Sequence, residues 1–123
     1  MLGCNSNFTY EHYTNILQEL RKSYKFTSFK SATTNDVILR HDVDASLHAA
    51  LKIAKIEKEL DISSTFFILF SSEFYNPISV DGSKIIRDIL DLGHKLGLHY
   101  NEFFIFENNI DAVETITTEI NLL

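Results

Sequence analysis

The chain has 123 residues, of which 45% are hydrophobic and 23% charged, and its formal net charge is −6. This length allows one domain at most, and the composition excludes a disordered segment or a coiled coil. Because the charge is negative and Lys and Arg do not cluster, nucleic acid and an anionic membrane surface are excluded as main partners. No apolar run approaches the roughly 20 residues that span a bilayer. The single cysteine, Cys4, fits a reducing compartment, so we expect a cytoplasmic protein.

Apolar side chains recur at three- and four-residue steps between Thr9 and Tyr24, which predicts a first helix with Thr9 as its N-cap. A polar loop, residues 31–36, leads into an apolar strand that ends in acids, Val37–Asp44. A second helix is expected over residues 46–60, with one apolar stripe facing the core. Its charged side chains are assigned to the solvent face: Lys52, Lys55, Glu57 and Glu59.

The second half of the chain repeats this alternation. Residues 65–70 form an unbroken apolar run, typical of a strand buried on both faces, and residues 71–82 form a loop. Ser83 is expected to cap a third helix that ends at Gly93, and a short strand over residues 95–100 follows. A last amphipathic helix is expected, with its apolar stripe at Ile110, Val113, Ile116, Ile120 and Leu123. Strands that alternate with helices predict an α/β fold with a parallel sheet.

The strand Val37–Asp44 carries the residues of greatest chemical interest. Side chains alternate between faces with a period of two, so Arg40, Asp42 and Asp44 share one face. Two carboxylates so close together repel, hence one must pair with a cation, bind a metal or have a raised pKa. The alternative is a loop in which one Asp caps the following helix and the other is solvated.

His99 ends the last predicted strand, and parallel strands would bring it to the same edge as Asp42 and Asp44. Aspartate and histidine that converge at one edge are typical of a metal site. His48, four residues after Asp44, is either a solvent-facing residue in the first turn of its helix or a ligand or proton partner of the acids. His94, at the opposite end of its strand, is interpreted as structural.

The segment Ile-Leu-Arg-His-Asp-Val-Asp at residues 38–44, followed by Gly-His-Lys-Leu-Gly-Leu-His-Tyr at residues 93–100, resembles the polysaccharide deacetylases of the NodB-homology group. The resemblance is to the subgroup whose first motif reads HDVD where others read TFDDG. It implies a partial (β/α) barrel of the polysaccharide-deacetylase type and removal of acetyl groups from N-acetylated sugars with one divalent metal, zinc or a similar ion such as cobalt. By the same resemblance Asp42 is the catalytic base, and Asp44 and His99 are metal ligands.

The chain departs from the family pattern in two ways. The family's second motif, HxxxH, is incomplete because Phe103 stands where its second histidine would be. The third ligand would then come from His48, Asn101, Glu102 or water, and Tyr75 is a candidate substrate contact. The family's later strands, which bring an arginine-bearing motif and a final histidine, have no counterpart, so residues 1–123 resemble the first half of one barrel domain.

Two hypotheses of function follow from the resemblance. The first is a metal-dependent hydrolase that removes N-acetyl groups from a sugar or a surface-polysaccharide precursor. The second is a truncated, non-catalytic remnant or carbohydrate-binding module, and hydrolysis of another C–N bond, as in the allantoinase-like relatives of this fold, is a further option. Half a barrel would leave part of its sheet uncovered and able to pair with another chain. We expect that uncovered surface, and hence self-association, to involve Phe66, Phe67, Ile68, Leu69 and Phe70.

Overall fold

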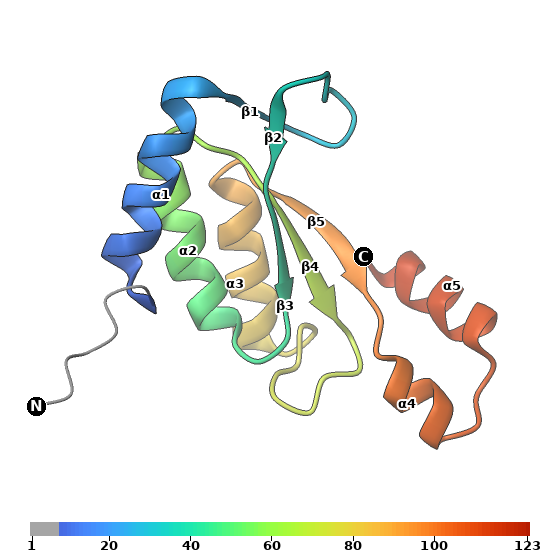
Figure 1. The fold of residues 1–123 in the computed structure, drawn as a ribbon. Coiled ribbons are helices and arrows are strands. Elements are labelled where there is room, and N and C mark those ends of the chain that lie inside the picture. The colour runs from blue at the N-terminus through green and yellow to red at the C-terminus, as the bar shows by residue number, and fades with distance from the viewer. Residues whose placement is uncertain (1–7) are drawn as a thin grey trace, which may run out of the picture.

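The computed structural model describes residues 8–123, and Cys4 lies outside this part of the chain (Figure 1). The elements occur in the order α1 (Tyr10–Ser23), β1 (Lys25–Thr27), β2 (Asp36–Ile38), β3 (Arg40–Val43), α2 (Leu47–Glu59), β4 (Thr65–Leu69), α3 (Val80–Asp91), β5 (Lys95–His99), α4 (Glu102–Glu107) and α5 (Ala112–Leu122). No described helix has the length and the apolar character needed to cross a membrane.

The strands of the described region form two parallel sheets, neither of which closes into a barrel. One sheet pairs β1 with β2, and the other has the order β3-β4-β5. Helix α2 connects β3 to β4, and α3 connects β4 to β5, so strands and helices alternate as the sequence predicts. The mixed α/β class with parallel strands is confirmed.

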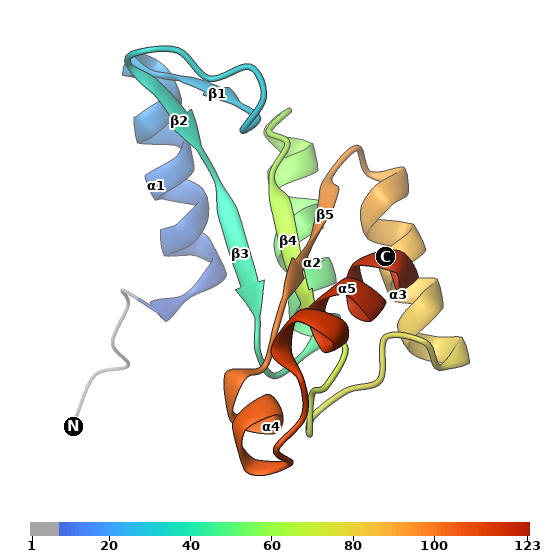
Figure 2. The same cartoon turned by 90° about the vertical axis from the view of Figure 1, so that its right-hand side faces the viewer.

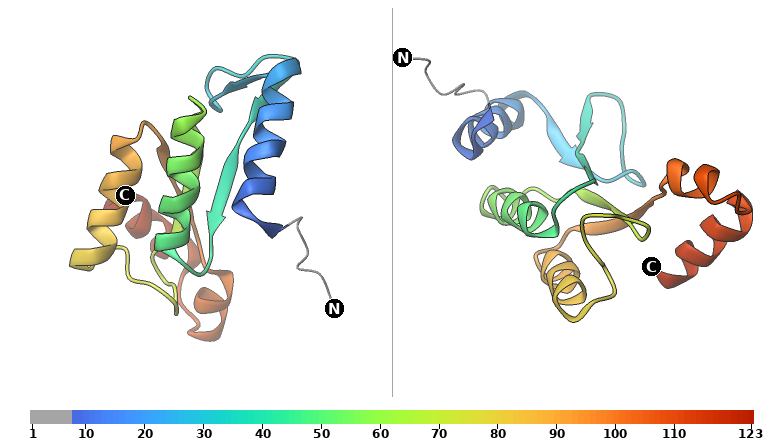
Figure 3. Two further views of the ribbon diagram at one scale, coloured as in Figure 1. Left: turned by 90° about the vertical axis from the view of Figure 1, so that its left-hand side faces the viewer. Right: turned by 90° about the horizontal axis from the view of Figure 1, so that it is seen from below.

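Helices α1, α2 and α3 stand side by side on one face of the larger sheet, whereas α4 and α5 lie beyond its other side (Figure 3). The hydrophobic core fills the space between α2, α3 and the strands. Because side chains alternate along a strand, every second residue of β3, β4 and β5 points toward these helices. The buried residues of the core are Val43, Leu47, Ala50, Ala54, Phe66, Ile68, Ile85 and Ile89.

Short polar side chains define where most of the helices begin. Thr9 caps α1, as the sequence predicts, and Ser46 caps α2; each accepts a hydrogen bond from the backbone N–H three residues later. The expected cap at Ser83 is wrong, because Ser79 accepts the hydrogen bond of the Gly82 N–H and α3 begins at Val80. The helix gains one turn at its start.

Two further predictions differ in outcome: the glycine that ends α3, and the long strand that ends in the acids. Gly93 follows α3 with φ of 94°, the left-handed conformation that favours glycine after a helix, so this prediction is confirmed. The strand Val37–Asp44 is instead divided at Leu39: β2 before it pairs with β1, and β3 after it pairs with β4. The Leu39 carbonyl accepts a hydrogen bond from the Thr65 N–H at 3.2 Å, which starts the β3-β4 pairing.

The apolar run of β4 is covered more completely than the half-barrel hypothesis predicts. Phe66 and Ile68 are fully buried and Leu69 is 8% exposed, so the expectation that these three are uncovered is wrong. Helices α2 and α3 shield the first two, while Phe67 and Phe70 remain half-buried. Several exposed large apolar side chains lie on and between α4 and α5, among them Phe103, Phe106, Ile110, Val113 and Ile120. Self-association itself stays a prediction.

Candidate functional site at the carboxyl edge of the sheet

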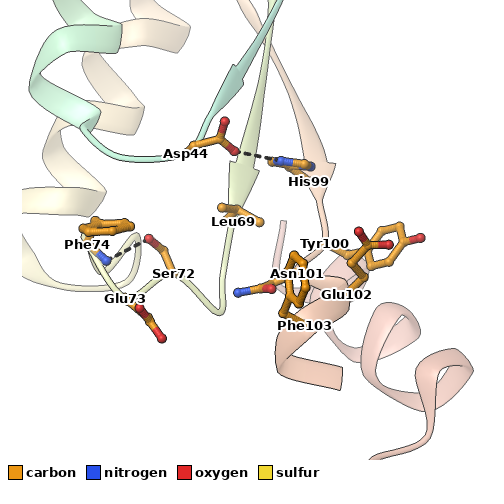
Figure 4. Close-up of a pocket in the computed structure, with 10 residues that line it drawn as sticks. All are labelled: Asp44, Leu69, Ser72, Glu73, Phe74, His99, Tyr100, Asn101, Glu102 and Phe103. Atoms are coloured by element: carbon orange, nitrogen blue, oxygen red, sulfur yellow. Dashed lines mark hydrogen bonds and ion pairs between the residues drawn. The ribbon is translucent and has the colours of Figure 1, made fainter. Parts of the chain in front are cut away.

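Asp44 and His99 meet at the carboxyl edge of the larger sheet. Asp44 comes directly after β3, and His99 is the last residue of β5. Although 55 residues separate them in sequence, Nε2 of His99 lies 3.0 Å from Oδ1 of Asp44 (Figure 4). Their side chains are 31% and 71% exposed, respectively, so both can be reached from solvent. The sequence predicted this convergence from the parallel arrangement of the strands.

A pocket of about 450 Å³ opens beside this pair (Figure 4). Its walls come from the loop after β4 and from the start of α4. The lining contains three carboxylates and no lysine or arginine, and three aromatic side chains offer apolar surface. The residues concerned are Asp44, Glu73 and Glu102 for the acids, and Phe74, Tyr100 and Phe103 for the aromatics. Apolar and aromatic walls with a few polar groups are typical of small-molecule sites. A bound sugar can stack its apolar face on such rings while its hydroxyls and amides form hydrogen bonds to the polar groups.

Asp42 lies on the same face of the sheet, one alternation of β3 before Asp44. It pairs in register with Phe67, whereas His99 pairs with Leu69 at the edge, so Asp42 lies about 7 Å before the carboxyl edge, toward the amino end of the strands. Two donors of Arg40, Nε at 3.1 Å and an Nη, bond to the same oxygen of Asp42, Oδ1. The ion pair that the sequence allowed for one of the acids is therefore made by Asp42.

The surface next to Asp42 depends on a close contact between β4 and β5. The guanidinium of Arg40 lies 4.1 Å above the centre of the Phe67 ring, and that ring lies across Gly97 of β5. A Cβ atom at Gly97 would stand 2.5 Å from Phe67 Cε1, which no real contact tolerates. Gly97 thus leaves room for the Phe67 ring beside β5, and the ring supports the arginine that holds Asp42.

Tyr75 has a different position from the one expected of a substrate contact. Its hydroxyl donates to the Val43 carbonyl at 2.6 Å and accepts from the Leu69 N–H at 2.8 Å. Burial of the ring and the nearby negative charge of Asp44 raise the pKa of Tyr75, although the bond from Leu69 opposes them. The hydroxyl is engaged by the backbone at the ends of β3 and β4.

The other candidate ligands lie around the pocket or away from it. Asn101 caps α4 through Oδ1, and its amide donates to the Ser71 carbonyl at 2.9 Å, so this side chain joins the loop after β4 to α4. Glu102 lines the pocket. His48 is exposed and pairs with Asp81 of α3 at 3.0 Å, which matches the solvent-facing interpretation.

The donor atoms of Asp44 and His99 fit a divalent ion in their chemistry. A carboxylate oxygen and an imidazole nitrogen are both ligands of zinc and related metals. Among residues 8–123, however, no three His, Cys, Asp or Glu side chains are placed to hold one ion together. The pair would supply two protein ligands, fewer than the three of most catalytic zinc sites, and further positions fall to water, to substrate or to a carboxylate that changes its rotamer.

A second polar group lies at the opposite, amino end of the sheet, inside the protein. Glu57 of α2 is fully buried and accepts hydrogen bonds from Tyr13 at 2.6 Å, from His41 and from Ser64. His94 Nδ1 lies 3.5 Å from the same carboxylate. We call Tyr13, His41, Glu57, Ser64 and His94 the buried polar cluster; it joins α1 and α2 to the starts of β3, β4 and β5.

The buried polar cluster corrects the assignment of Glu57 to the solvent face. Burial alone would raise the pKa of Glu57, but the hydrogen bonds from His41, Ser64 and Tyr13 outweigh it and hold that pKa below its ordinary value. Burial and the Glu57 carboxylate in turn raise the pKa of Tyr13. A signal was present in the sequence, since Glu57 follows Ala50 and Ala54 at helical spacing and so belongs to the buried stripe.

His94 is structural, as the sequence predicts, and its contacts define its tautomer. Its Nδ1 accepts a hydrogen bond from the Ser64 N–H at 3.1 Å, and its Nε2 donates to the Ala54 carbonyl at 2.9 Å. A ring that accepts at one nitrogen and donates at the other is neutral. Its role is to join α2 to the starts of β4 and β5.

Comparison with protein-family models, with curated proteins and with solved structures finds no match for this chain. The resemblance to polysaccharide deacetylases therefore rests on the residues of the chain itself. Function has to be inferred from the chemistry of the Asp44–His99 pair and its pocket.

Proposed function

We propose that the Asp44–His99 pair is part of a divalent-metal site in a hydrolase that removes N-acetyl groups from a carbohydrate. The observation that carries this proposal is the convergence of the two side chains, 3.0 Å apart, at the mouth of a pocket of about 450 Å³. The half-exposed histidine and the exposed carboxylate are open to a ligand. The aromatic and polar lining suits a sugar with an amide substituent.

Asp44 and His99 would hold the metal, preferably zinc or a similar ion such as cobalt. When bound, such an ion polarises an amide carbonyl and lowers the pKa of a coordinated water. Phe74, Tyr100 and Phe103 would position the sugar by stacking and exclude part of the bulk water from the acetamide. Glu73 and Glu102, on opposite sides of the pocket, would accept hydrogen bonds from sugar hydroxyls.

Asp42 is the candidate general base. Arg40 bonds to Oδ1 alone among the carboxylate oxygens, so Oδ2 remains to receive a proton. The two hydrogen bonds from Arg40 hold the carboxylate in one orientation. In an active preparation, Asp42→Asn should abolish acetate release and leave metal affinity nearly unchanged, because the base is not one of the ligands.

Cobalt binding tests the metal site directly. Co²⁺ titrated into the wild-type chain should produce visible absorption bands, and Asp44→Ala and His99→Ala should each remove them. His48→Ala is the matched control, since His48 also forms a 3.0 Å pair with an aspartate on the surface. Equal spectra for the wild type, Asp44→Ala and His99→Ala would refute the proposed site.

A carbohydrate-binding module without catalysis is the second candidate, and one observation favours it. Asp42, the candidate base, is held by Arg40 and lies one alternation away from the Asp44–His99 pair. Calorimetry with oligomers of N-acetylglucosamine, together with an acetate assay, separates the two functions. Binding without acetate release in the presence of Zn²⁺ or Co²⁺ would support the binding module.

A further inference from the structure

A second pocket lies where α4 joins α5, and we call it the α4–α5 pocket. Its volume is about 600 Å³, within the range of small-molecule sites. The walls come mainly from α4, from the turn after it and from the first residue of α5. Most of the lining is apolar, and Glu102 is its one charged residue. The apolar residues are Phe103, Ile105, Phe106, Ile110 and Ala112.

The α4–α5 pocket adjoins the pocket at the carboxyl edge of the sheet. Tyr100, Glu102 and Phe103 line both of them. In Figure 4, Tyr100 and Glu102 lie on the side of the first pocket that is opposite Phe74. The two pockets therefore share one wall, and a ligand that extends past this wall can occupy both.

The two pockets differ in the ligand groups that they suit. The first contains the Asp44–His99 pair and the carboxylate of Glu73, which suit polar groups. The second presents exposed apolar side chains, Phe103 and Phe106 among them, and exposed apolar surface that gathers in one place is typical of a binding site. One polar and one apolar compartment side by side fit a ligand that is divided in the same way.

Charge restricts what the apolar part of this ligand can be. Residues 96–123 contain five aspartates and glutamates and no lysine or arginine, although the whole chain has 11 lysines and arginines. This segment would repel an anionic headgroup or an anionic membrane surface. A symmetric dimer through the same face would place the acids of two copies opposite each other, which is unfavourable. An uncharged apolar group fits best.

We propose that the α4–α5 pocket binds an uncharged apolar chain attached to the sugar that occupies the pocket at Asp44 and His99. The inference rests on the proposed function, since that function makes a sugar the ligand of the first pocket. The substrate class is then an amphiphile, an N-acetylated sugar that carries an alkyl, acyl or isoprenoid chain. Phe103 belongs to both walls, so it lies where the sugar joins the chain.

Calorimetry with alkyl glycosides of N-acetylglucosamine, from methyl to octyl and below their micelle concentrations, tests the chain separately from the sugar. Each methylene group that leaves water should strengthen binding by up to about fourfold. We expect the affinity of the wild type to rise by at least about tenfold from the methyl to the hexyl glycoside. Equal affinity for all members of the series, or binding by none, would overturn the proposal.

Two alanine variants and a control locate the two parts of the ligand. Phe106 is 86% exposed and lines the α4–α5 pocket but not the first, so Phe106→Ala should fold normally, flatten the dependence on chain length and leave the affinity for the methyl glycoside unchanged. Phe74→Ala, in the first pocket, should weaken binding of every member by the same factor. Val113→Ala is the matched control, because Val113 is exposed on α5 and lines neither pocket. An unchanged dependence on chain length in Phe106→Ala would overturn the proposal, as would unchanged affinities in Phe74→Ala.

Acetate release separates this proposal from the proposed function. A dependence on chain length without acetate from any glycoside, in the presence of Zn²⁺ or Co²⁺, would refute the hydrolase and support the apolar site. Acetate release without any dependence on chain length would support the hydrolase and overturn the apolar site. Sedimentation tests the competing occupant: a dimer that Phe106→Ala dissociates would show that a second copy covers the α4–α5 pocket, and would overturn the proposal.

Discussion

The two ends of the same three strands carry histidine and carboxylate side chains in opposite settings. At the amino end, Glu57 is fully buried and receives three side-chain hydrogen bonds. At the carboxyl end, Asp44 is 71% exposed and its carboxylate is bonded to the imidazole of His99. The first group lies between the helices and the strands, whereas the second lies at the end of the strands next to α4 and the loop after β4 (Figure 2).

This difference separates a structural role from a ligand-binding role for the same residue types. A buried carboxylate has to be satisfied inside the protein, because an unpaired one would be strongly destabilising. An exposed pair contributes little to stability and retains free lone pairs for a ligand. We therefore expect substitutions at the amino end to change folding and substitutions at the carboxyl end to change binding.

The largest effect is expected for Glu57→Ala. It leaves Tyr13, His41 and Ser64 without their shared acceptor inside the protein, which should lower the free energy of unfolding by about 3–5 kcal/mol. Urea denaturation followed by circular dichroism measures it. Glu59→Ala, on the exposed side of the same helix, is the control and should cost less than about 0.5 kcal/mol. A loss for Glu57→Ala as small as that of the control would contradict the structural role.

Gly97→Ala should have the next largest effect, because its Cβ would clash with the Phe67 ring at 2.5 Å. We expect a loss of about 1–3 kcal/mol, typical of an added methyl group in a packed contact. The same substitution in a Phe67→Leu background should cost clearly less. Additive losses in this double-mutant cycle would show that the two residues do not interact.

The pH dependence of stability should distinguish Glu57 from an ordinary surface acid. Its pKa is lower in the folded protein than the ordinary 4.5, so the unfolded chain binds more protons across that interval. The ionised carboxylate therefore contributes stability above pH 4.5, and this contribution is lost as the pH falls through the folded-state pKa. The stability difference between the wild type and Glu57→Gln should shrink on acidification. If it grows instead, Glu57 is protonated in the native state.

Asp44→Ala and His99→Ala should have the smallest effects on folding. Their pair is exposed and worth at most about 1 kcal/mol, so unfolding midpoints should stay close to that of the wild type. Thermal unfolding of both variants and of Glu57→Ala compares the stability effects of the two ends of the sheet in one experiment. A loss of several kcal/mol in Asp44→Ala would show that the pair stabilises the fold. It would count against a ligand-binding role.

The sequence predicted the parts of the fold that depend on local pattern. Apolar periodicity located α1 and α2, and Gly93 marked the end of α3 because its backbone conformation requires glycine. Alternating strands and helices implied parallel pairing, and from that pairing followed the meeting of Asp44 with His99. These inferences succeed since each depends on neighbours in sequence or on a general rule of topology.

The failures concern contacts that no local pattern encodes. Glu57 was assigned to solvent by its charge, although the partners that satisfy it come from three other elements or loops. The start of α3 was misplaced because Ser79 and Ser83 are equivalent as caps in sequence. The position of Tyr75 depends on the path of the loop after β4, which brings its hydroxyl within hydrogen-bond distance of the Val43 carbonyl and the Leu69 N–H.

The most direct test of the whole account is an NMR titration of the chain with Zn²⁺ in which all five histidines are observed together. The imidazole ¹⁵N signals of His99 should shift first and saturate at the lowest zinc concentration. The signals of His41 and His94 should stay fixed because the buried polar cluster engages these rings, and the His12 and His48 signals should respond only at higher concentration. A first response at His48, or no selective response at His99, would contradict the assignment of the Asp44–His99 pair as the metal site.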